Sequence, residues 1–371
     1  MVEFLTVATK NCPPYPVYCG TDAAGTLARI WQKRWRQAVI IGDDNTLALF
    51  GDALEGAVSG KIDNLLRLSF HPGETFKTRE SKAQLEDAML AAGLDRQSCI
   101  VAVGGGIALD LAGYVAATYM RGIDHINVAT SLLAQVDAAV GGKTAVNTPL
   151  GKNLVGAFHH PRAVLVDTAA LSSLPTLELR NGLAEAIKHA VIADAKLFED
   201  LEGWAFADPK SKLSPPPEVL IQRCVAIKAE VVAADEGERG RRQVLNFGHT
   251  VAHALEKATN HDLSHGQAVA IGMVVEGYLA QKLRGFPRAD LHRLESLLRQ
   301  FGLPTRPKLP FSAVQELFMA DKKTLANQIY CSIPTELGTI DAQDGNWATH
   351  TNLDDLSGIW TSLQDTGIRG D

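Results

Sequence analysis

The chain has 371 residues, of which 46% are hydrophobic, and a formal net charge of -6. A chain of this length exceeds the usual size of a domain with one hydrophobic core, which predicts two domains. The chain is mildly acidic and has no basic tract, which argues against nucleic acid as a partner. No run approaches the ~18 apolar residues of a transmembrane helix.

The cysteines and the amino terminus indicate a cytoplasmic protein. The cysteines are odd in number, scattered and without C-x-x-C spacing: Cys12, Cys19, Cys99, Cys224 and Cys331. This pattern predicts reduced thiols rather than a disulfide framework or a zinc knuckle. The first residues, MVEFLTVATKNCPP, lack the basic and apolar regions of a signal peptide.

The first half of the chain alternates short apolar runs with helical patterns. Strands are predicted at 37–45, 64–70, 98–106, 126–130 and 163–168, and helices at 81–94 and 108–120. Such alternation predicts a mostly parallel sheet with helices on both faces, as in Rossmann-like nucleotide-binding domains.

The pattern becomes helical near residue 176. Helical periodicity covers 177–204, 217–236, 244–259 and 266–285, with few strand signals. We therefore predict an α/β domain over residues 1–176 and an all-α domain over residues 177–371.

Gly104, Gly105 and Gly106 follow a predicted strand and open a predicted helix. Backbone N–H groups in such a turn can approach a phosphate, and the helix amino terminus favours an anion. The spacing is not G-x-G-x-x-G, so a plain tight turn remains an equal alternative. A bound nucleotide could set its ribose against Asp43 or Asp44, which end an earlier strand.

Two lysines, Lys143 and Lys152, lie in the stretch 137–158, which is glycine-rich and is interpreted as mostly turn-like. Lysines on such loops suit a small anionic ligand, whereas the alternative is a pair of solvated loop lysines. The apolar neighbours of both lysines weaken that alternative.

Three histidines lie within 17 residues, and His249 and His253 share one helical face. Glu185 and Lys188 lie one turn apart on another apolar helix, where charged side chains are rarely buried unpaired. Two histidines and one glutamate form a zinc set with an open position. Spacing alone selects His249 and His253 as the histidine ligands.

Several stretches together resemble the 3-dehydroquinate synthase family of sugar-phosphate cyclases, in the family's order and over nearly the whole chain. They are PGETFK, GGGIALDLAGYVAATYMRGID, SLLAQVDAAVGGKTAVNTPLGKNLVGAF, LAEAIKHAVIAD, RRQVLNFGHTVAHALE, LSHGQAVAIGM and DKK. The resemblance implies a dehydroquinate synthase-like fold.

The resemblance also implies roles for individual residues. A divalent metal, Zn²⁺ or Co²⁺, would be held by Glu185, His249 and His265, so that His253 becomes a catalytic or substrate-contacting residue and not a ligand. The implied NAD contacts are Asp44, Glu74, Lys77, Gly104, Gly105, Gly106, Asp110, Thr130, Ser131, Lys143 and Lys152. The other implied catalytic or substrate contacts are Asp137, Lys143, Lys152, Asn153, Lys188, Lys228, Arg242, Asn246, Lys322 and Lys323. Arg121 would reach the substrate phosphate across a homodimer interface.

The implied reaction converts 3-deoxy-D-arabino-heptulosonate 7-phosphate to 3-dehydroquinate and phosphate, with NAD used catalytically. The chain departs from the family pattern at Ala108, Ser131 and Gln267, and it lacks a proline before Ser131. The alternatives are a cyclase acting on another sugar phosphate, a metal-dependent polyol dehydrogenase of the same fold, and a scaffold without turnover. A neutral polyol would not need so many lysines and arginines, and the intact metal set argues against a scaffold.

Overall fold

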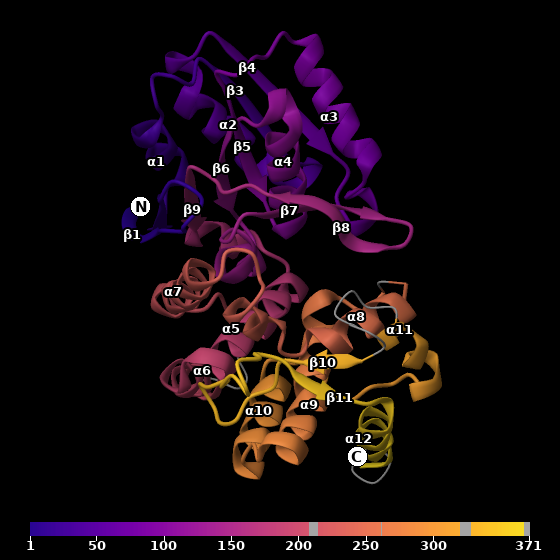
Figure 1. The fold of residues 1–371 in the computed structure, drawn as a ribbon. Helices are drawn as coiled ribbons and strands as arrows, with labels where there is room; N and C mark the ends of the chain where they lie inside the picture. The colour runs from indigo at the N-terminus through magenta and orange to yellow at the C-terminus, as the bar shows by residue number, and fades with distance from the viewer. Residues whose placement is uncertain (208–213, 261, 320–327, 367–371) are drawn as a thin grey trace. The chain divides into compact units, whose positions relative to one another are not determined.

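The computed structural model describes residues 1–207, 214–260, 262–319 and 328–366 (Figure 1). The chain divides into two compact units, the first formed by Met1–Pro175 with Lys228–Ala233 and the second by Thr176–Ile227 with Ala234–Asp371. The segment Lys228–Ala233 is part of helix α7 (Glu218–Ala234), which the sequence division after residue 176 had assigned wholly to the second domain.

The first unit is built on a seven-stranded sheet with the order β1-β2-β9-β6-β5-β3-β4. Only the β1–β2 pair is antiparallel, so the predicted mostly parallel sheet is confirmed. The strands are β1 (Val2–Val7), β2 (Tyr15–Gly20), β3 (Gln37–Asp43), β4 (Asn64–Phe70), β5 (Ser98–Gly104), β6 (Asp124–Ala129) and β9 (Ala163–Asp167). The sequence analysis missed β1 and β2.

Helices cover both faces of this sheet. They are α1 (Ala23–Ile30), α2 (Asp44–Val58), α3 (Arg79–Ala91) and α4 (Gly106–Thr118). On β5, Cys99, Val101 and Val103 pack in one cluster with Leu27 of α1 and Leu54 of α2. The alternate β5 side chains are equally buried, on the face where α4 contacts the strand. Burial on both faces explains why the strands are continuous apolar runs.

The stretch 137–158 is not turn-like, which corrects the sequence interpretation. A short π-helix (Ala134–Ala138) leads to an antiparallel hairpin of β7 (Lys143–Thr148) and β8 (Gly151–Phe158). Gly156 permits close strand pairing, because a Cβ there would lie 2.0 Å from the Thr144 carbonyl oxygen. Glycines that allow such an approach resemble turn glycines in sequence.

The second unit is mainly helical, as predicted. Besides the rest of α7, its helices are α5 (Thr176–Ala193), α6 (Ala195–Ala207), α8 (His249–Ala258), α9 (His265–Arg284), α10 (Arg288–Gln300), α11 (Gln315–Met319) and α12 (Leu353–Thr366). The all-α expectation was wrong in one respect, since β10 (Ile329–Cys331) and β11 (Thr349–Thr351) form a small antiparallel pair. Across the described ranges, no helix combines the length and apolar character needed to span a membrane.

Two predicted helix boundaries also change. The single helix expected over 177–204 is α5 and α6, separated at Asp194, whose carboxylate caps α6 by accepting from Leu197 N at 2.9 Å. The helix expected over 244–259 begins only at His249, because Gly248 adopts φ +81°. A 3₁₀ helix, Arg241–Asn246, precedes it.

Helices α5, α8 and α9 come unusually close to one another in the second unit. A Cβ on Gly266 of α9 would lie 2.4 Å from Asn181 Cα of α5, and a Cβ on Gly272 would lie 1.9 Å from the Gly248 oxygen at the start of α8. Only glycine fits at these two contacts. The first sets the start of α9 against α5, and the second sets the start of α8 against the inner part of α9.

Candidate active site

Glu185 of α5, His249 of α8 and His265 of α9 form one cluster in the second unit. The Oε1 atom of Glu185 lies 3.1 Å from His265 Nε2 and 3.4 Å from His249 Nε2. Two ligands each ~2.0–2.1 Å from a tetrahedral zinc ion stand roughly 3.3 Å apart. The donor set and its spacing therefore fit one divalent metal ion.

The outer nitrogen of each histidine ring has an oxygen partner. His249 Nδ1 lies 3.2 Å from the Phe247 carbonyl oxygen, and His265 Nδ1 lies 3.3 Å from Glu256 Oε1. Such partners fix the ring orientation and leave Nε2 as the metal-facing atom. Glu256 is 3% exposed, and the sequence analysis did not identify it.

His253 occupies a different position. Its ring packs edge-on against His249 with centroids 5.7 Å apart, but it is not among the ligand atoms that converge with Glu185. The convergent pair is His249 and His265 rather than the His249 and His253 pair that spacing favours. Neighbours at i and i+4 share a helix face, yet this cluster draws one residue from each of three helices.

Charge coupling within the cluster is strong. Burial acts to raise the pKa of Glu185, but the charge of Lys188 and the two histidines outweigh it and hold that pKa well below its ordinary value. Burial lowers the pKa of His249 to about 4, although Glu185 opposes the shift. Burial also disfavours protonated His265, yet hydrogen bonds to Glu185 and Glu256 raise its pKa to about 10. A metal ion bound here would require neutral imidazoles and an ionised carboxylate, so its binding would be coupled to the loss of a proton from His265.

Two further side chains position the ends of these helices. Glu276 of α9 is fully buried and accepts hydrogen bonds from Gly248 N at 2.7 Å and Val251 N at 3.1 Å, which caps α8. Gln267 completes a capping box with Ser264 at the start of α9, so the glutamine at this departure from the family pattern still serves as a cap. The sequence analysis missed the role of Glu276, although its charge within an apolar helix was a usable signal.

The remaining predicted residues of the second unit that the structure describes lie on α5 and on the 3₁₀ helix that precedes α8. Lys188 is 1% exposed and forms an ion pair with Glu185. Arg242 is also 1% exposed, and its Nη1 donates to the Glu236 carbonyl oxygen at 2.7 Å. Asn246 donates to Glu238 at 3.2 Å. Lys322 and Lys323 lie outside the described residues.

A second group of predicted residues gathers at the carboxyl edge of the parallel sheet in the first unit. Asp44 follows β3, Gly104 ends β5 and Gly106 begins α4, and Thr130 and Ser131 follow β6. The chain runs from β3 outward to β4 and returns to β5 on the other side of β3, which makes a topological switch point where such folds bind ligands. Gly104 must be glycine, because its φ is +147° and a Cβ there would lie 2.6 Å from Ala108 Cβ.

Beside this edge, a buried lysine links several predicted contacts. Lys77 is 3% exposed, and its Nζ donates to Asp110 at 2.5 Å and to Asn153 at 2.6 Å. Burial raises the pKa of Asp110 despite the opposing charge of Lys77. Glu74 lies 3.9 Å from Lys152 Nζ, so the short 3₁₀ helix Glu74–Phe76 and strand β8 bring these predicted contacts together.

The other predicted residues of the first unit lie either in the segment from the π-helix to β7 or just before β6. Asp137 forms an ion pair with Lys228 at 2.8 Å, and Lys143 begins β7 with its side chain exposed. Arg121 is exposed just before the amino-terminal end of β6, at the sheet edge opposite Thr130. Met120 and Arg121 both adopt left-handed backbone angles, with φ of 49° and 67°.

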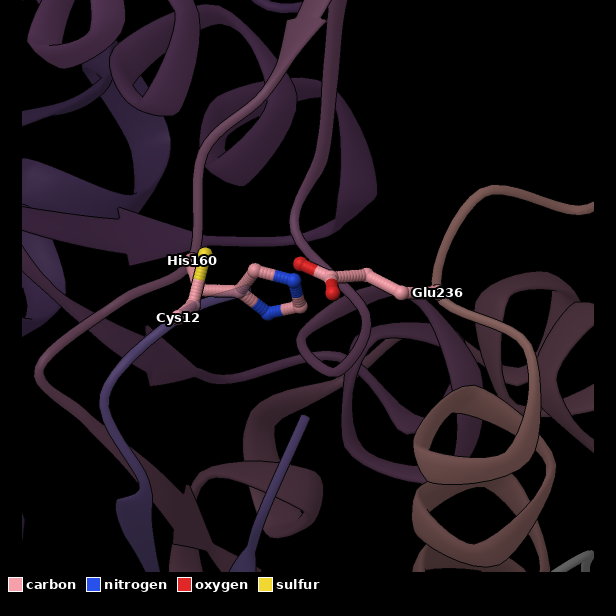
Figure 2. A group of neighbouring side chains, drawn as sticks. All are labelled: Cys12, His160 and Glu236. Atoms are coloured by element: carbon pink, nitrogen blue, oxygen red, sulfur yellow. The ribbon is translucent and has the colours of Figure 1, made fainter. Parts of the chain in front are cut away.

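The cysteines form no disulfide, and all five lie in the described part of the chain. Figure 2 draws Cys12 and His160 of the first unit and also labels Glu236, which belongs to the second unit. The His160 ring packs on Tyr15 with centroids 5.6 Å apart. It also lies 3.0 Å from where a Cβ of Gly142 would stand, so its orientation is set by packing.

Two family models match the chain in succession. The model described as 3-dehydroquinate synthase N-terminal matches residues 67–181, and the model described as 3-dehydroquinate synthase C-terminal matches residues 182–324. A 3-dehydroquinate synthase of Synechococcus sp. is 42% identical over 332 residues, covering 88% of this chain and 90% of the relative. That of Nostoc punctiforme is 44% identical over 317 residues, covering 84% and 87%.

Solved structures share the fold. A 2-deoxy-scyllo-inosose synthase complexed with carbaglucose-6-phosphate, NAD⁺ and Co²⁺ matches with a TM-score of 0.85 at 23% identity, covering 97% of this chain and 99% of that one. A 2-epi-5-epi-valiolone synthase from Streptomyces hygroscopicus subsp. jinggangensis, with NAD⁺ and Zn²⁺ bound, matches at 0.82 and 26% with the same coverage. A glycerol dehydrogenase from Schizosaccharomyces pombe reaches 0.67 at 17% identity, covering 95% and 90%. The fold alone therefore does not separate a cyclase from a dehydrogenase, whereas the sequence relatives do.

Proposed function

The chain belongs to the 3-dehydroquinate synthase family of sugar-phosphate cyclases, and we propose that it works with a tightly bound NAD and one divalent metal ion. The family's reaction converts 3-deoxy-D-arabino-heptulosonate 7-phosphate to 3-dehydroquinate and phosphate, a step of the shikimate pathway that leads to aromatic amino acids. The convergence of Glu185, His249 and His265 is the single observation that carries the proposal.

We assign the metal to Glu185 Oε1, His249 Nε2 and His265 Nε2, with Zn²⁺ or Co²⁺ as the ion. The separations of 3.1 and 3.4 Å, together with the oxygen partners on both outer ring nitrogens, support this assignment. When bound, the ion would supply a Lewis acid for a substrate hydroxyl oxygen. Lys188 pairs with the other carboxylate oxygen of Glu185 and so keeps Oε1 turned to the histidines. We assign His253 to substrate contact.

We assign the NAD to the carboxyl edge of the sheet, over Gly104–Gly106 and against Asp44. The switch point and the absence of side chains on these glycines support close approach of a pyrophosphate to the amino terminus of α4. NAD would supply a hydride acceptor that is restored in each turnover. Glu74, Lys77, Asp110, Thr130, Ser131, Lys143 and Lys152 complete the proposed contacts.

The chain's own cations suit a substrate that carries both a phosphate and a carboxylate. Lys188, Lys228 and Arg242 are each buried, and each is already held by an oxygen partner. Pre-oriented cations lower the cost of ordering the binding site around the substrate. A neutral polyol would gain nothing from them, which favours the cyclase over the dehydrogenase alternative. Asp137, Asn153, Asn246, Lys322 and Lys323 belong to the same proposed set.

Arg121 is the one residue of the proposed set that we assign to the substrate of a second copy of the chain. It precedes β6, whereas Thr130 follows that strand. Six strand residues rise about 3.3 Å each, so Arg121 stands roughly 20 Å from the edge that we assign to NAD. Left-handed φ at Met120 and Arg121 costs free energy and is characteristic of functional turns. We propose that Arg121 contacts the substrate phosphate bound to a second copy in a homodimer.

Phosphate release tests the proposed function. Purified protein, depleted of nucleotide and supplied with substoichiometric NAD, should release many phosphates per NAD from 3-deoxy-D-arabino-heptulosonate 7-phosphate, with no accumulation of NADH. Glucose 6-phosphate and sedoheptulose 7-phosphate serve as matched substrates without the carboxylate. Stoichiometric NADH formation with a polyol would instead establish the dehydrogenase, and release from either control sugar alone would establish another cyclase.

A further inference from the structure

A hollow of about 210 Å³ opens at the carboxyl ends of β3 and β4 in the first unit. Its walls are Asp44, Leu47 and Ala48 from the start of α2, and Arg67 and Ser69 from β4. Residues two apart on a strand share a face, so Arg67 and Ser69 point to the same side. The hollow thus joins an apolar wall to one acid and one base.

Asp44 supplies the acid. Its carboxylate lies 2.9 Å from His71 Nδ1, and hydrogen bonds from Ser69 and His71 lower its pKa. An ionised carboxylate at the end of a strand accepts hydrogen bonds from the adenosine ribose hydroxyls. The same charge repels a phosphate on the ribose 2′ oxygen.

Arg67 has the opposite chemistry, because arginine at such a position accommodates the 2′-phosphate of NADP. Here its Nη2 lies 2.7 Å from Asp52 Oδ1 and 2.5 Å from Glu55 Oε2. Both acids lie on α2, three residues apart and therefore on one helix face. The guanidinium lies across Gly51, whose added Cβ would stand 3.1 Å from Arg67 Cζ.

These contacts leave the hollow net negative. Asp52 and Glu55 together place two negative charges on one guanidinium, and Asp44 adds a third at the ribose end. A 2′-phosphate would therefore meet an arginine whose charge is already neutralised, beside carboxylates that repel it. The ribose hydroxyls of NAD meet no such repulsion.

We propose that the ion pairs with Asp52 and Glu55 prevent Arg67 from binding a 2′-phosphate. The preference for NAD over NADP would then depend on these two carboxylates acting through Arg67. The inference rests on the proposed function, in that the dinucleotide must bind at this edge of the sheet. It goes further by assigning the preference to a carboxylate pair that does not itself line the hollow.

Calorimetric titration of the full chain with NAD and NADP tests this inference without relying on turnover. Asp52 and Glu55 are 95% and 41% exposed, so their neutral replacements should leave the fold intact. Asp52→Asn with Glu55→Gln should tighten NADP binding by about tenfold, the size of one charged hydrogen bond gained, and change NAD binding by less than about threefold. Adding Arg67→Gln should abolish the gain.

A matched control removes two carboxylates elsewhere in the unit. Glu80→Gln with Asp87→Asn makes the same change in net charge on α3, where both side chains are exposed, and should leave NADP binding unchanged. If the wild type binds NAD but the Asp52/Glu55 variant binds NADP no more tightly than the wild type does, the inference is wrong and the proposed cofactor stands. A gain that survives Arg67→Gln overturns the role of Arg67. A wild type that binds neither nucleotide overturns the proposed cofactor site and this inference together.

Discussion

Replacing Glu276 with glutamine tests how α8 is held in place for metal binding. The carboxylate is fully buried and accepts from Gly248 N at 2.7 Å and Val251 N at 3.1 Å. Glutamine has nearly the same shape but only one acceptor oxygen, so one buried N–H loses its partner and faces an NH₂ group. An unsatisfied buried donor costs about 1–3 kcal/mol, and loss of the anion at the helix amino terminus adds up to about 2 kcal/mol. We expect Glu276→Gln to destabilise the protein by about 2–4 kcal/mol.

Two measurements separate this effect from a general loss of stability. Chemical denaturation reports the free energy of unfolding, and competition with a chelator reports metal affinity, which should weaken because His249 is the first residue of α8. Glu199→Gln on α6 is the control, since that glutamate is 56% exposed and should change stability by less than about 0.5 kcal/mol. If Glu276→Gln unfolds within about 0.5 kcal/mol of wild type, which is the range of ordinary surface substitutions, the capping argument is wrong.

Three further perturbations probe the same units. His265→Ala should lose the metal by elemental analysis while His253→Ala keeps it, and the reverse result would return the assignment to the pair chosen by spacing. Burial first, and then neighbouring positive charges, hold the pKa of His125 well below its ordinary value. The unfolded state therefore binds the extra proton below about pH 6.5, so the stability from this group is complete above that pH and falls by up to about 1.4 kcal/mol per pH unit below it. Denaturation at several pH values should show that slope reduced in His125→Asn, and an unchanged slope would exclude His125 as its source. Gly272→Ala, whose Cβ would lie 1.9 Å from the Gly248 oxygen, should lower stability by at least about 2 kcal/mol, and a thermal midpoint equal to wild type would contradict the close contact.

Strong periodicity made the elements of the parallel sheet and the long helices predictable. Runs such as β3 and β5 are apolar because both of their faces are buried, and this produces a plain sequence signal. The hairpin β7–β8 escaped because Gly151 and Gly156 resemble turn residues, while their actual role is close strand pairing and connection. Local sequence does not distinguish these two uses of glycine.

The candidate metal cluster could be predicted only in part from sequence spacing. Spacing within one helix finds His249 and His253, since it detects only neighbours on the same face. Glu185 and His265 join His249 through the packing of α5, α8 and α9, which no local pattern encodes, and only the family resemblance nominated all three. Glu276 could have been found, because a carboxylate within the apolar stretch AIGMVVEGY demands a buried partner, the same argument that drew attention to Glu185.

Arg121 provides a test that joins assembly to catalysis. The assay uses limiting substrate, where Arg121→Ala is nearly inactive because it binds substrate weakly and His265→Ala is inactive because it lacks the metal. If Arg121 acts in its own chain, mixing the two variants gives no more activity than the sum of the two alone. If it acts on the partner copy, a mixed dimer has one site with an intact His265 and a donated Arg121. Random exchange of equal amounts then gives half mixed dimers with one working site each, or about a quarter of wild-type activity. Arg121→Ala alone should keep its metal and NAD while binding substrate more weakly by about 1.5–3 kcal/mol, the value of a hydrogen bond to a charged group. Subunit exchange is followed by native mass spectrometry with one variant isotopically labelled. The length of β6, roughly 20 Å, is the structural reason to expect a donated Arg121, and confirmed exchange without recovered activity would refute the shared site.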